Sequence, residues 1–267
     1  MGHRAGAVAG SRRSLQRPAG RRLGCACRHA AGHRRQPAGL AAGAAGGPVS
    51  APARIAVLAS GRGSNLQCLL DGIGSGQLHA RIVGVFSDKP GAAALDKIAP
   101  ALRWARSPRE FAGRDAFDAA LGDAVAASTP DWIVCAGYMR ILGAGFVQRF
   151  GGRLVNIHPS LLPRHKGLHT HARAIEAGDA EHGASVHFVV PELDAGAVIA
   201  QARVPVLAGD DADALAARVL AVEHPLLLAT VRLLVDGRVA EQDGTVLFDG
   251  QSLFNPLRLD SDGTLRR

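Results

Sequence analysis

The first fifty residues of this 267-residue chain contain no Asp, Glu or Lys, although they contain nine Arg. The formal net charge of +8 therefore comes from this segment, and residues 51–267 are close to neutral. A basic surface for nucleic acid is thus not predicted for the body of the chain. The segment is rich in Ala, Gly, Arg and Pro and has no helical or alternating periodicity, so it cannot bury enough apolar surface to offset the entropy lost on ordering. We predict that residues 1–50 form a disordered basic extension. A targeting segment and a translation start later than Met1 are the alternatives.

Long apolar runs and spaced cysteine pairs are also missing. No stretch of 18 apolar residues predicts a membrane span, and residues 1–50 lack the apolar core of a secretory signal. Cys25 and Cys27 are too close together for a standard structural zinc site, and Cys68 and Cys135 fall in apparent core elements. Aromatic residues make up only 4% of a chain that is 47% hydrophobic, which suits one α/β domain or two small ones. We expect a reduced, cytoplasmic protein.

From residue 51 on, short apolar runs that end in loops alternate with amphipathic stretches. The runs predict buried strands, at 54–60, 81–87, 131–136, 154–158, 184–189 and 198–206. The stretches between them predict helices, from Leu66 on, at 95–98, and over 114–127, 172–177 and 211–234. Such units predict an α/β fold with a doubly wound, mostly parallel sheet, and residues 237–248 predict a C-terminal antiparallel hairpin. The domain would span residues 51–250, and residues 251–267 would be a C-terminal tail.

A glycine-rich turn at Gly61–Asn65 joins the first strand to the first helix. Glycine permits a tight turn with close ligand approach, and the free N–H groups at the start of the helix would face an anion. No Lys-Ser/Thr pair follows, as it would in a P-loop, and the third Gly of a dinucleotide fingerprint is absent. A phosphate site is the functional interpretation, and a turn that binds nothing is the alternative.

Asn156 and His158 end a predicted strand immediately before a proline. Side chains two residues apart share a face of a strand, and open α/β sheets bind ligands at the carboxyl edge. Asp194, in a tight loop at 191–196, is a candidate partner, because a carboxylate beside an imidazole favours the protonated ring. An Asn amide can donate to a developing oxyanion, so the three residues suit attack on a carbonyl-like carbon. A turn with a capping Asn and an exposed His is the alternative.

Four histidines lie within fourteen positions, which raises the alternative of a metal site: His158, His165, His169 and His171. A Gly two residues after His165 argues against the helix that the pair His165 and His169 would need, and His169 with His171 would supply only two ligands. We predict no metal.

Several motifs follow one another in a recognisable order: GRGSNLQ at 61–67, GYMRIL at 137–142, NIHPSLLP at 156–163, and GASVHFV at 183–189 followed by ELDAG at 192–196. With them, the sequence over roughly residues 54–250 closely resembles the phosphoribosylglycinamide formyltransferases, folate-dependent enzymes of purine (IMP) biosynthesis. The resemblance implies a Rossmann-like formyltransferase fold. It also implies transfer of a formyl group from 10-formyltetrahydrofolate to the amine of 5-phosphoribosylglycinamide through a tetrahedral intermediate. The expected partners are these two small molecules, with no membrane or nucleic acid, for a monomer or homodimer.

The resemblance also implies the residues of the site. Asn156, His158 and Asp194 would be catalytic. The ribonucleotide would be bound by Gly63, Ser64, Asn65, Leu220 and Glu223. The folate would be bound by Arg114, Met139, Arg140, Ile141, Leu142, Asn156, Val190, Pro191, Glu192, Leu193 and Asp194. The sequence departs from the family pattern at Asp88, Pro191 and Leu220, and the stretch 98–107 looks altered; such changes could weaken an affinity without changing the reaction.

Two relatives share the same core and serve as alternatives. Methionyl-tRNA formyltransferase adds a sizeable C-terminal domain, where only a short hairpin is predicted here. Formyltetrahydrofolate deformylase adds an N-terminal regulatory domain with a strand and helix periodicity that residues 1–50 lack. From other classes, the Arg-rich extension could bind nucleic acid, and the histidines could belong to a metal hydrolase.

Overall fold

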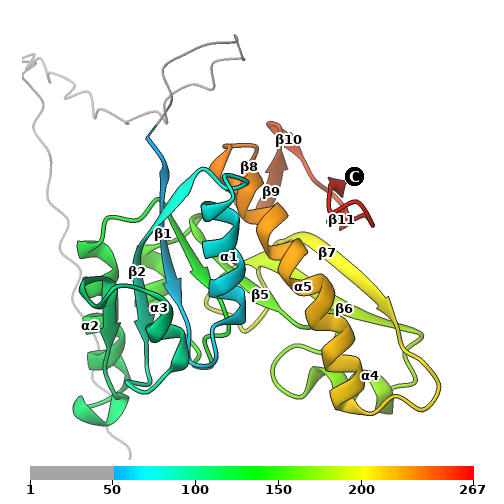
Figure 1. Ribbon diagram of the computed structural model, residues 1–267, viewed down its shortest axis with the longest axis horizontal. Helices are drawn as coiled ribbons and strands as arrows, with labels where there is room; N and C mark the ends of the chain where they lie inside the picture. Colours follow the sequence, from blue (N-terminus) through cyan, green and yellow to red (C-terminus); the bar gives the residue numbers. More distant parts are fainter. Residues whose placement is uncertain (1–50) are drawn as a thin grey trace, which may run out of the picture. The chain divides into compact units, whose positions relative to one another are not determined.

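The computed structural model of the protein describes residues 51–267, which contain a nine-stranded central sheet (Figure 1). Its order is β12-β11-β7-β6-β5-β4-β1-β2-β3. The strands are β1 Ala53–Leu58, β2 Ala80–Ser87, β3 Arg103–Ala105, β4 Trp132–Cys135, β5 Leu154–His158, β6 Glu181–Phe188, β7 Val198–Pro205, β11 Leu257–Leu259 and β12 Leu265–Arg266. The strands from β3 to β5 pair in parallel, whereas β6 runs antiparallel to β5 and β7. The prediction of a mostly parallel α/β sheet is confirmed.

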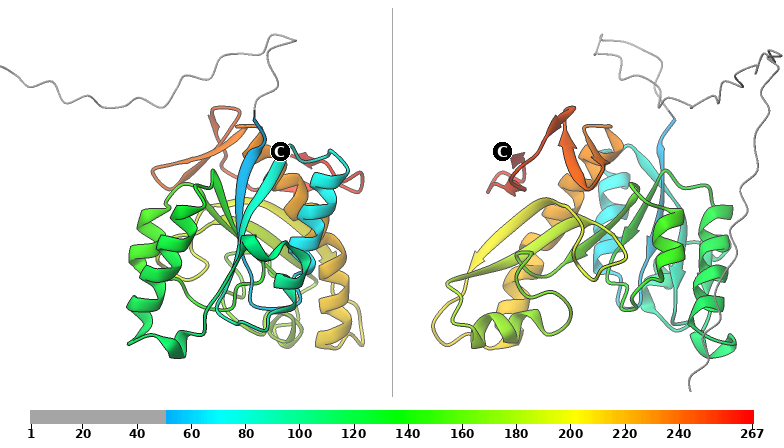
Figure 2. Two further views of the ribbon diagram at one scale, coloured as in Figure 1. Left: turned by 60° about the vertical axis from the view of Figure 1, so that its left-hand side comes forward. Right: turned by 180° about the vertical axis from the view of Figure 1, so that it is seen from behind.

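Helices cover both faces of this sheet (Figures 1 and 2). The helices α1 (Ser64–Gly74) and α5 (Ala212–Val235) share one hydrophobic core with Ile55 and Val57 of β1. The helices α2 (Arg114–Ala127) and α3 (Ala144–Arg149) share a second core with Ala56 and Leu58. Alternate side chains of a strand point to opposite faces, so β1 is apolar throughout because both of its faces are covered. The remaining helix, α4 (Thr170–Glu176), packs against α5.

The C-terminal residues form more structure than a tail. The predicted hairpin is present as β8 (Val239–Gln242) and β9 (Thr245–Phe248), and β10 (Gln251–Ser252) adds a third antiparallel strand. Beyond it, β11 pairs in parallel with β7, and β12 pairs with β11. Residues 257–266 therefore belong to the central sheet of the domain, which differs from the boundary drawn from the sequence. Strands of two or three residues are too short to show a period of two.

Other short elements were not predicted either. They are β3, α3 and the 3-10 helices η2 (Pro100–Leu102) and η3 (Pro108–Glu110). The short helix expected at 95–98 is a 3-10 helix, η1 (Ala93–Lys97). Each of these elements has three to six residues, which is less than two turns of an α-helix and leaves no periodic pattern to detect.

By length and composition, α5 is the one helix within residues 51–267 that could cross a membrane, with a mean hydropathy of 1.5 over 18 residues. No such helix was predicted from the sequence, where no run of 18 residues is apolar throughout. The helix begins at an N-cap, where Asp211 Oδ1 accepts a 2.8 Å hydrogen bond from the Ala214 amide. Several of its apolar side chains, among them Leu215, Val219 and Leu227, are fully buried in the core, and the helix packs against β6 and β7. An apolar helix that packs into a hydrophobic core passes the same test of length and composition as a membrane span.

Candidate active site

The carboxyl end of β5 presents Asn156 and His158 on one side of the strand, as the period of two requires. The His158 side chain is only 8% exposed, and its Nδ1 lies 3.5 Å from Asp194 Oδ2. Its other nitrogen, Nε2, lies 3.1 Å from the backbone carbonyl oxygen of His165. A carbonyl can only accept, so Nε2 carries a hydrogen. The imidazole thus has an acceptor at each nitrogen.

Asp194 reaches this site from the loop between β6 and β7. Its backbone has a φ of +46°, in the left-handed region that few non-glycine residues adopt. Its Oδ2 also accepts a 2.9 Å hydrogen bond from the Gly167 amide. At Gly196 in the same loop, a Cβ would lie 1.8 Å from the Phe188 carbonyl oxygen. Glycine therefore permits the close approach that brings the loop carboxylate against β6 and His158.

His187 of β6 holds the Asn156 side chain. Its Nδ1 lies 2.8 Å from the Phe188 carbonyl oxygen and must donate to it. Burial lowers the pKa of His187, against the smaller opposing effects of the Phe188 carbonyl and Asp194. A neutral ring with its hydrogen on Nδ1 leaves Nε2 as the acceptor for Asn156 Nδ2 at 3.2 Å. The second hydrogen of that amide remains available to a ligand.

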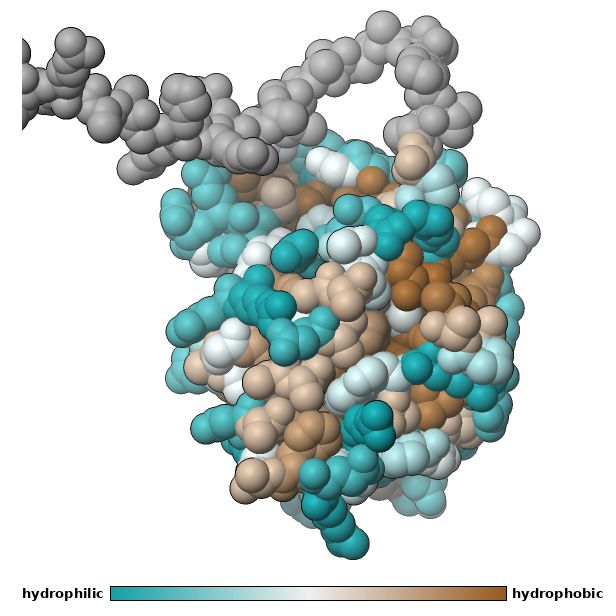
Figure 3. All heavy atoms as spheres, turned by 90° about the vertical axis from the view of Figure 1, so that its left-hand side faces the viewer, coloured by the Kyte–Doolittle hydropathy of each residue, from teal (hydrophilic) through white to brown (hydrophobic). Residues whose placement is uncertain are grey.

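These groups lie in the wall of a cavity of about 750 Å³. Each folate residue implied by the sequence except Arg114 lines it: Met139, Arg140, Ile141, Leu142, Asn156, Val190, Pro191, Glu192, Leu193 and Asp194. Arg114 does not line the cavity, but its Nη2 donates a 2.8 Å hydrogen bond to the backbone carbonyl of Ile141, which does. Large apolar side chains at the cavity are half exposed, including Met139 at 59% and Leu168 at 62%. Figure 3 shows one face of the molecule, on which apolar and polar side chains are interspersed. An apolar lining with a few convergent polar groups is typical of a small-molecule site.

The predicted ribonucleotide residues gather where α1 begins. Gly63 has a φ of +74°, and a Cβ there would lie 2.7 Å from the Ala94 Cβ, so this turn requires glycine. The Asn65 amide donates a 2.7 Å hydrogen bond to Glu223 Oε1 on α5. Burial raises the pKa of Glu223, while the Asn65 hydrogen bond acts in the opposite direction. Glu223 also lines the 750 Å³ cavity, so it connects the α1 turn with the cavity that contains His158.

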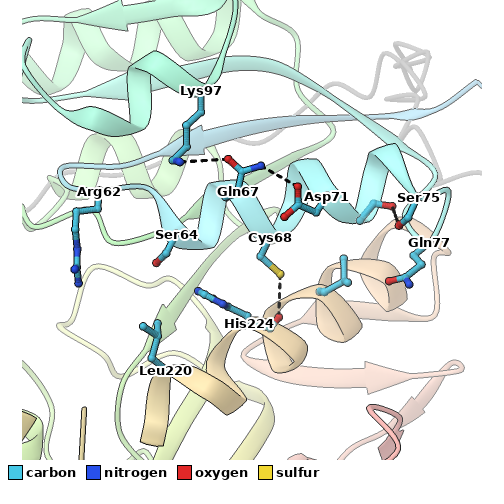
Figure 4. Close-up of a pocket in the computed structure, with 12 residues that line it drawn as sticks. Arg62, Ser64, Gln67, Cys68, Asp71, Ser75, Gln77, Lys97, Leu220 and His224 are labelled. Carbon is cyan, nitrogen blue, oxygen red and sulfur yellow. Dashed lines mark hydrogen bonds between the residues drawn. The ribbon is translucent and has the colours of Figure 1, made fainter. Parts of the chain in front are cut away.

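A second cavity of about 680 Å³ opens between α1 and α5 (Figure 4). Its lining includes Ser64 and Leu220, which the sequence assigned to the ribonucleotide, and the two cations Arg62 and Lys97. Lys97 Nζ donates a 3.2 Å hydrogen bond to Gln67 Oε1. Arg62 and Ser64 lie beside each other at the N-terminal end of α1 in Figure 4. This end of the cavity therefore combines positive charge with a hydroxyl and free backbone amides.

The thiols in this region are not activated. Burial raises the pKa of Cys135, at the end of β4, to about 12, and that of Cys68 on α1 to about 11. A thiol is nucleophilic as its thiolate, so neither side chain suits covalent catalysis near neutral pH. Within residues 51–267, no group of three or more His, Cys, Asp or Glu side chains is placed to hold a metal ion.

Comparison with known proteins shows the family to which the chain belongs. A formyl transferase family model matches residues 53–231. The chain belongs to the formyl transferase family. It is 44% identical over 201 residues to the phosphoribosylglycinamide formyltransferase of Escherichia coli (strain K12), which covers 74% of this chain and 95% of that protein.

Solved structures of formyl transferase relatives have the same fold as this chain. The phosphoribosylglycinamide formyltransferase of Coxiella burnetii superposes with a TM-score of 0.71 at 40% identity, covering 76% of this chain and 96% of that one. A formyltetrahydrofolate deformylase from Pseudomonas syringae pv. tomato superposes with a TM-score of 0.65 at 26% identity, covering 74% of this chain and 66% of that one.

Two residues that contact the predicted site, His187 and His165, were not among those predicted from the sequence. A histidine inside the apolar run 184–189 was a usable signal, because a polar ring on a buried strand needs partners. Nothing in the sequence indicates the contact that His165 makes, since its backbone carbonyl rather than its side chain meets His158.

Proposed function

We propose that the protein transfers the formyl group of 10-formyltetrahydrofolate to the amine of 5-phosphoribosylglycinamide. The observation that carries this proposal is the meeting of Asn156, His158 and Asp194 in the wall of one cavity, which Glu223 and Asn65 link to the α1 turn. Relatives with 40–44% identity over about three quarters of the chain bear the name of this activity. The setting would be purine biosynthesis.

The folate would occupy the 750 Å³ cavity. Its flat ring system suits an apolar wall formed by the 139–142 loop on one side and the 190–194 loop on the other. Arg114 would hold the first loop in place through the Ile141 carbonyl. Pro191 has no backbone N–H to offer, so any contact of the second loop with the pterin must come from its neighbours.

The ribonucleotide would span the two cavities. Its phosphate would bind at Gly63, Ser64 and Asn65, where the free amides of α1 face an anion. Leu220 offers this phosphate no polar group, and Arg62 and Lys97 would supply the positive charge from the same cavity lining. Glu223 would face the glycinamide end, which places the amine toward His158.

The chemistry would be direct transfer. The amine attacks the formyl carbon, and a tetrahedral intermediate forms whose oxyanion is stabilised by the Asn156 amide and the protonated His158 ring. Asp194 would keep the ring charged and oriented. The proton that the attacking amine loses is matched by one that passes to the departing folate nitrogen as the carbon–nitrogen bond breaks. Neither a covalent enzyme intermediate nor a metal is required. We expect the reaction to occur in the cytoplasm, with a monomer or homodimer as the working form.

Hydrolysis of the same folate is the second candidate, because a deformylase also shares this fold. The test is an assay of purified protein with 10-formyltetrahydrofolate and either 5-phosphoribosylglycinamide or water as the acceptor. Formylated ribonucleotide forming with first-order dependence on enzyme supports the proposal. If formate is released at the same rate whether or not the ribonucleotide is present, the protein hydrolyses the folate and the proposed transfer is wrong.

A further inference from the structure

His165 lies outside the wall of the folate cavity, but it contacts the catalytic imidazole. Its backbone carbonyl oxygen is 3.1 Å from His158 Nε2. Asp194 Oδ2 lies 3.5 Å from the opposite nitrogen, Nδ1. Two acceptors on opposite edges of a ring fix its rotation about the Cβ–Cγ bond.

The side chain of His165 holds this carbonyl in position. The ring is 11% exposed, and its Nε2 is 2.7 Å from Asp179 Oδ2. Asp179 lies just beyond α4, where its amide donates a 3.0 Å hydrogen bond to the Ala174 carbonyl, and its side chain is only 3% exposed. A carboxylate that is buried and fixed in this way is a firm anchor for the ring that it holds.

The backbone at His165 needs such an anchor. Its φ is +53°, a left-handed conformation that non-glycine residues adopt only where their surroundings enforce it. The Asp179 carboxylate also forms an ion pair with the Arg164 guanidinium. The backbone carbonyl of Arg164 accepts a 2.8 Å hydrogen bond from Ser160 Oγ. The turn that follows Pro159 is therefore tied to the segment beyond α4 through Asp179, which does not line the folate cavity.

We propose that His165 is a positioning residue for His158: the bond between its ring and Asp179 fixes its carbonyl, and the carbonyl fixes the catalytic imidazole. This inference rests on the proposed function, because it assumes that His158 acts on the reacting atoms. The ring of His165 touches neither substrate. Its loss therefore lowers the rate of the chemical step and leaves both Michaelis constants unchanged.

Two substitutions at this position separate hydrogen bonding from packing. His165→Phe keeps a ring to pack against His182, whose centroid lies 6.0 Å away, but it has no donor for Asp179. His165→Gln loses the ring and keeps an amide donor of similar reach. We expect kcat to fall on the order of 10- to 100-fold in His165→Phe, the scale of a misplaced catalytic group, and to stay within about threefold of the unsubstituted protein in His165→Gln. Arg173→Ala is the control, because it removes an exposed 2.6 Å contact with the Lys166 carbonyl of the same loop without reaching Asp179.

Nitrogen-15 spectra of the histidine rings give a second readout on the full chain. In the unsubstituted protein, the Nε2 hydrogen of His158 should be hydrogen-bonded and slow to exchange; in His165→Phe it should exchange with solvent. A rapidly exchanging hydrogen in the unsubstituted protein overturns the proposal, even if no variant folds. A normal kcat in His165→Phe also overturns the proposal, and so does an equal loss of kcat in His165→Phe and His165→Gln. Absence of any formyl transfer by the unsubstituted protein would overturn the proposed function instead, and the spectra would still test the positioning.

Discussion

The Asn65 side chain on α1 donates a 2.7 Å hydrogen bond to the Glu223 carboxylate on α5. These two residues are far apart in the sequence, and their contact joins the turn that would bind a phosphate to the cavity that contains His158. A single substrate with a phosphate at one end and an amine at the other could therefore be held at both ends by one rigid unit.

Removal of either member of the His158–Asp194 pair should reduce turnover by about two to four orders of magnitude, the scale for a lost general acid or oxyanion donor. His158→Ala removes the imidazole, and Asp194→Asn removes the charge 3.5 Å from it. Steady-state kinetics with both substrates measure the effect. Arg203→Ala, which breaks an exposed ion pair with Glu181, is the control. Near-normal turnover in His158→Ala would exclude it from the chemistry.

Gly63→Ala should destabilise the fold by roughly 1–3 kcal/mol and weaken ribonucleotide binding, because the added methyl meets Ala94 at 2.7 Å in a backbone with φ of +74°. Urea unfolding and the Michaelis constant for the ribonucleotide give the two effects. Gly61→Ala is a matched control two residues away, where a Cβ would have nothing within 4 Å. Equal stability of the two variants would contradict the steric argument.

Arg62→Ala should raise the Michaelis constant for the ribonucleotide about 5- to 30-fold, as expected for the loss of a charge-assisted contact, and leave that for the folate unchanged. The reason is that Arg62 lines the cavity beside Ser64, where Leu220 offers the phosphate nothing polar. The same substitution measured with the ribonucleoside, which lacks the phosphate, provides the control. If Arg62→Ala weakens binding of both ligands equally, Arg62 does not contact the phosphate.

Acid should destabilise the protein through His182. Burial lowers the pKa of this side chain to about 4 from 6.5, with His171 and His165 as further causes, so the folded state binds fewer protons than the unfolded chain between these values. The stability that this residue contributes is complete above pH 6.5 and is lost as the pH falls toward 4, by up to about 3 kcal/mol. Urea unfolding of the unsubstituted protein and of His182→Asn at pH 7.5, 5.5 and 4.5 measures it. A variant that loses as much stability as the parent over this range would show that other groups carry the acid sensitivity.

The sequence predicts the long elements of the fold well. The strand β1 is apolar throughout, and α2 has Phe117, Leu121 and Val125 on one stripe, so both appear where their patterns place them. The pieces with two or three residues, such as β11 and β12, are defined by backbone pairing with distant strands, and no local pattern records that pairing.

The candidate site likewise has a part that the sequence predicts and a part that it does not. Asn156, His158 and Asp194 could be named because the proposed chemistry depends on their side chains, and the structure brings them together. The supporting contacts could not be named. The Phe188 carbonyl that sets the tautomer of His187 and the His165 carbonyl at His158 are backbone groups, which every residue possesses.

The pairing of β11 with β7 has a practical meaning for shortened versions of the protein. Ala200 and Gln201 of β7 bond to β6 on one side and to β11 on the other. A chain ending at residue 250 would leave that second side open, with a row of backbone donors and acceptors facing solvent. Such an edge invites pairing with other molecules, so loss of residues 257–266 is expected to promote self-association.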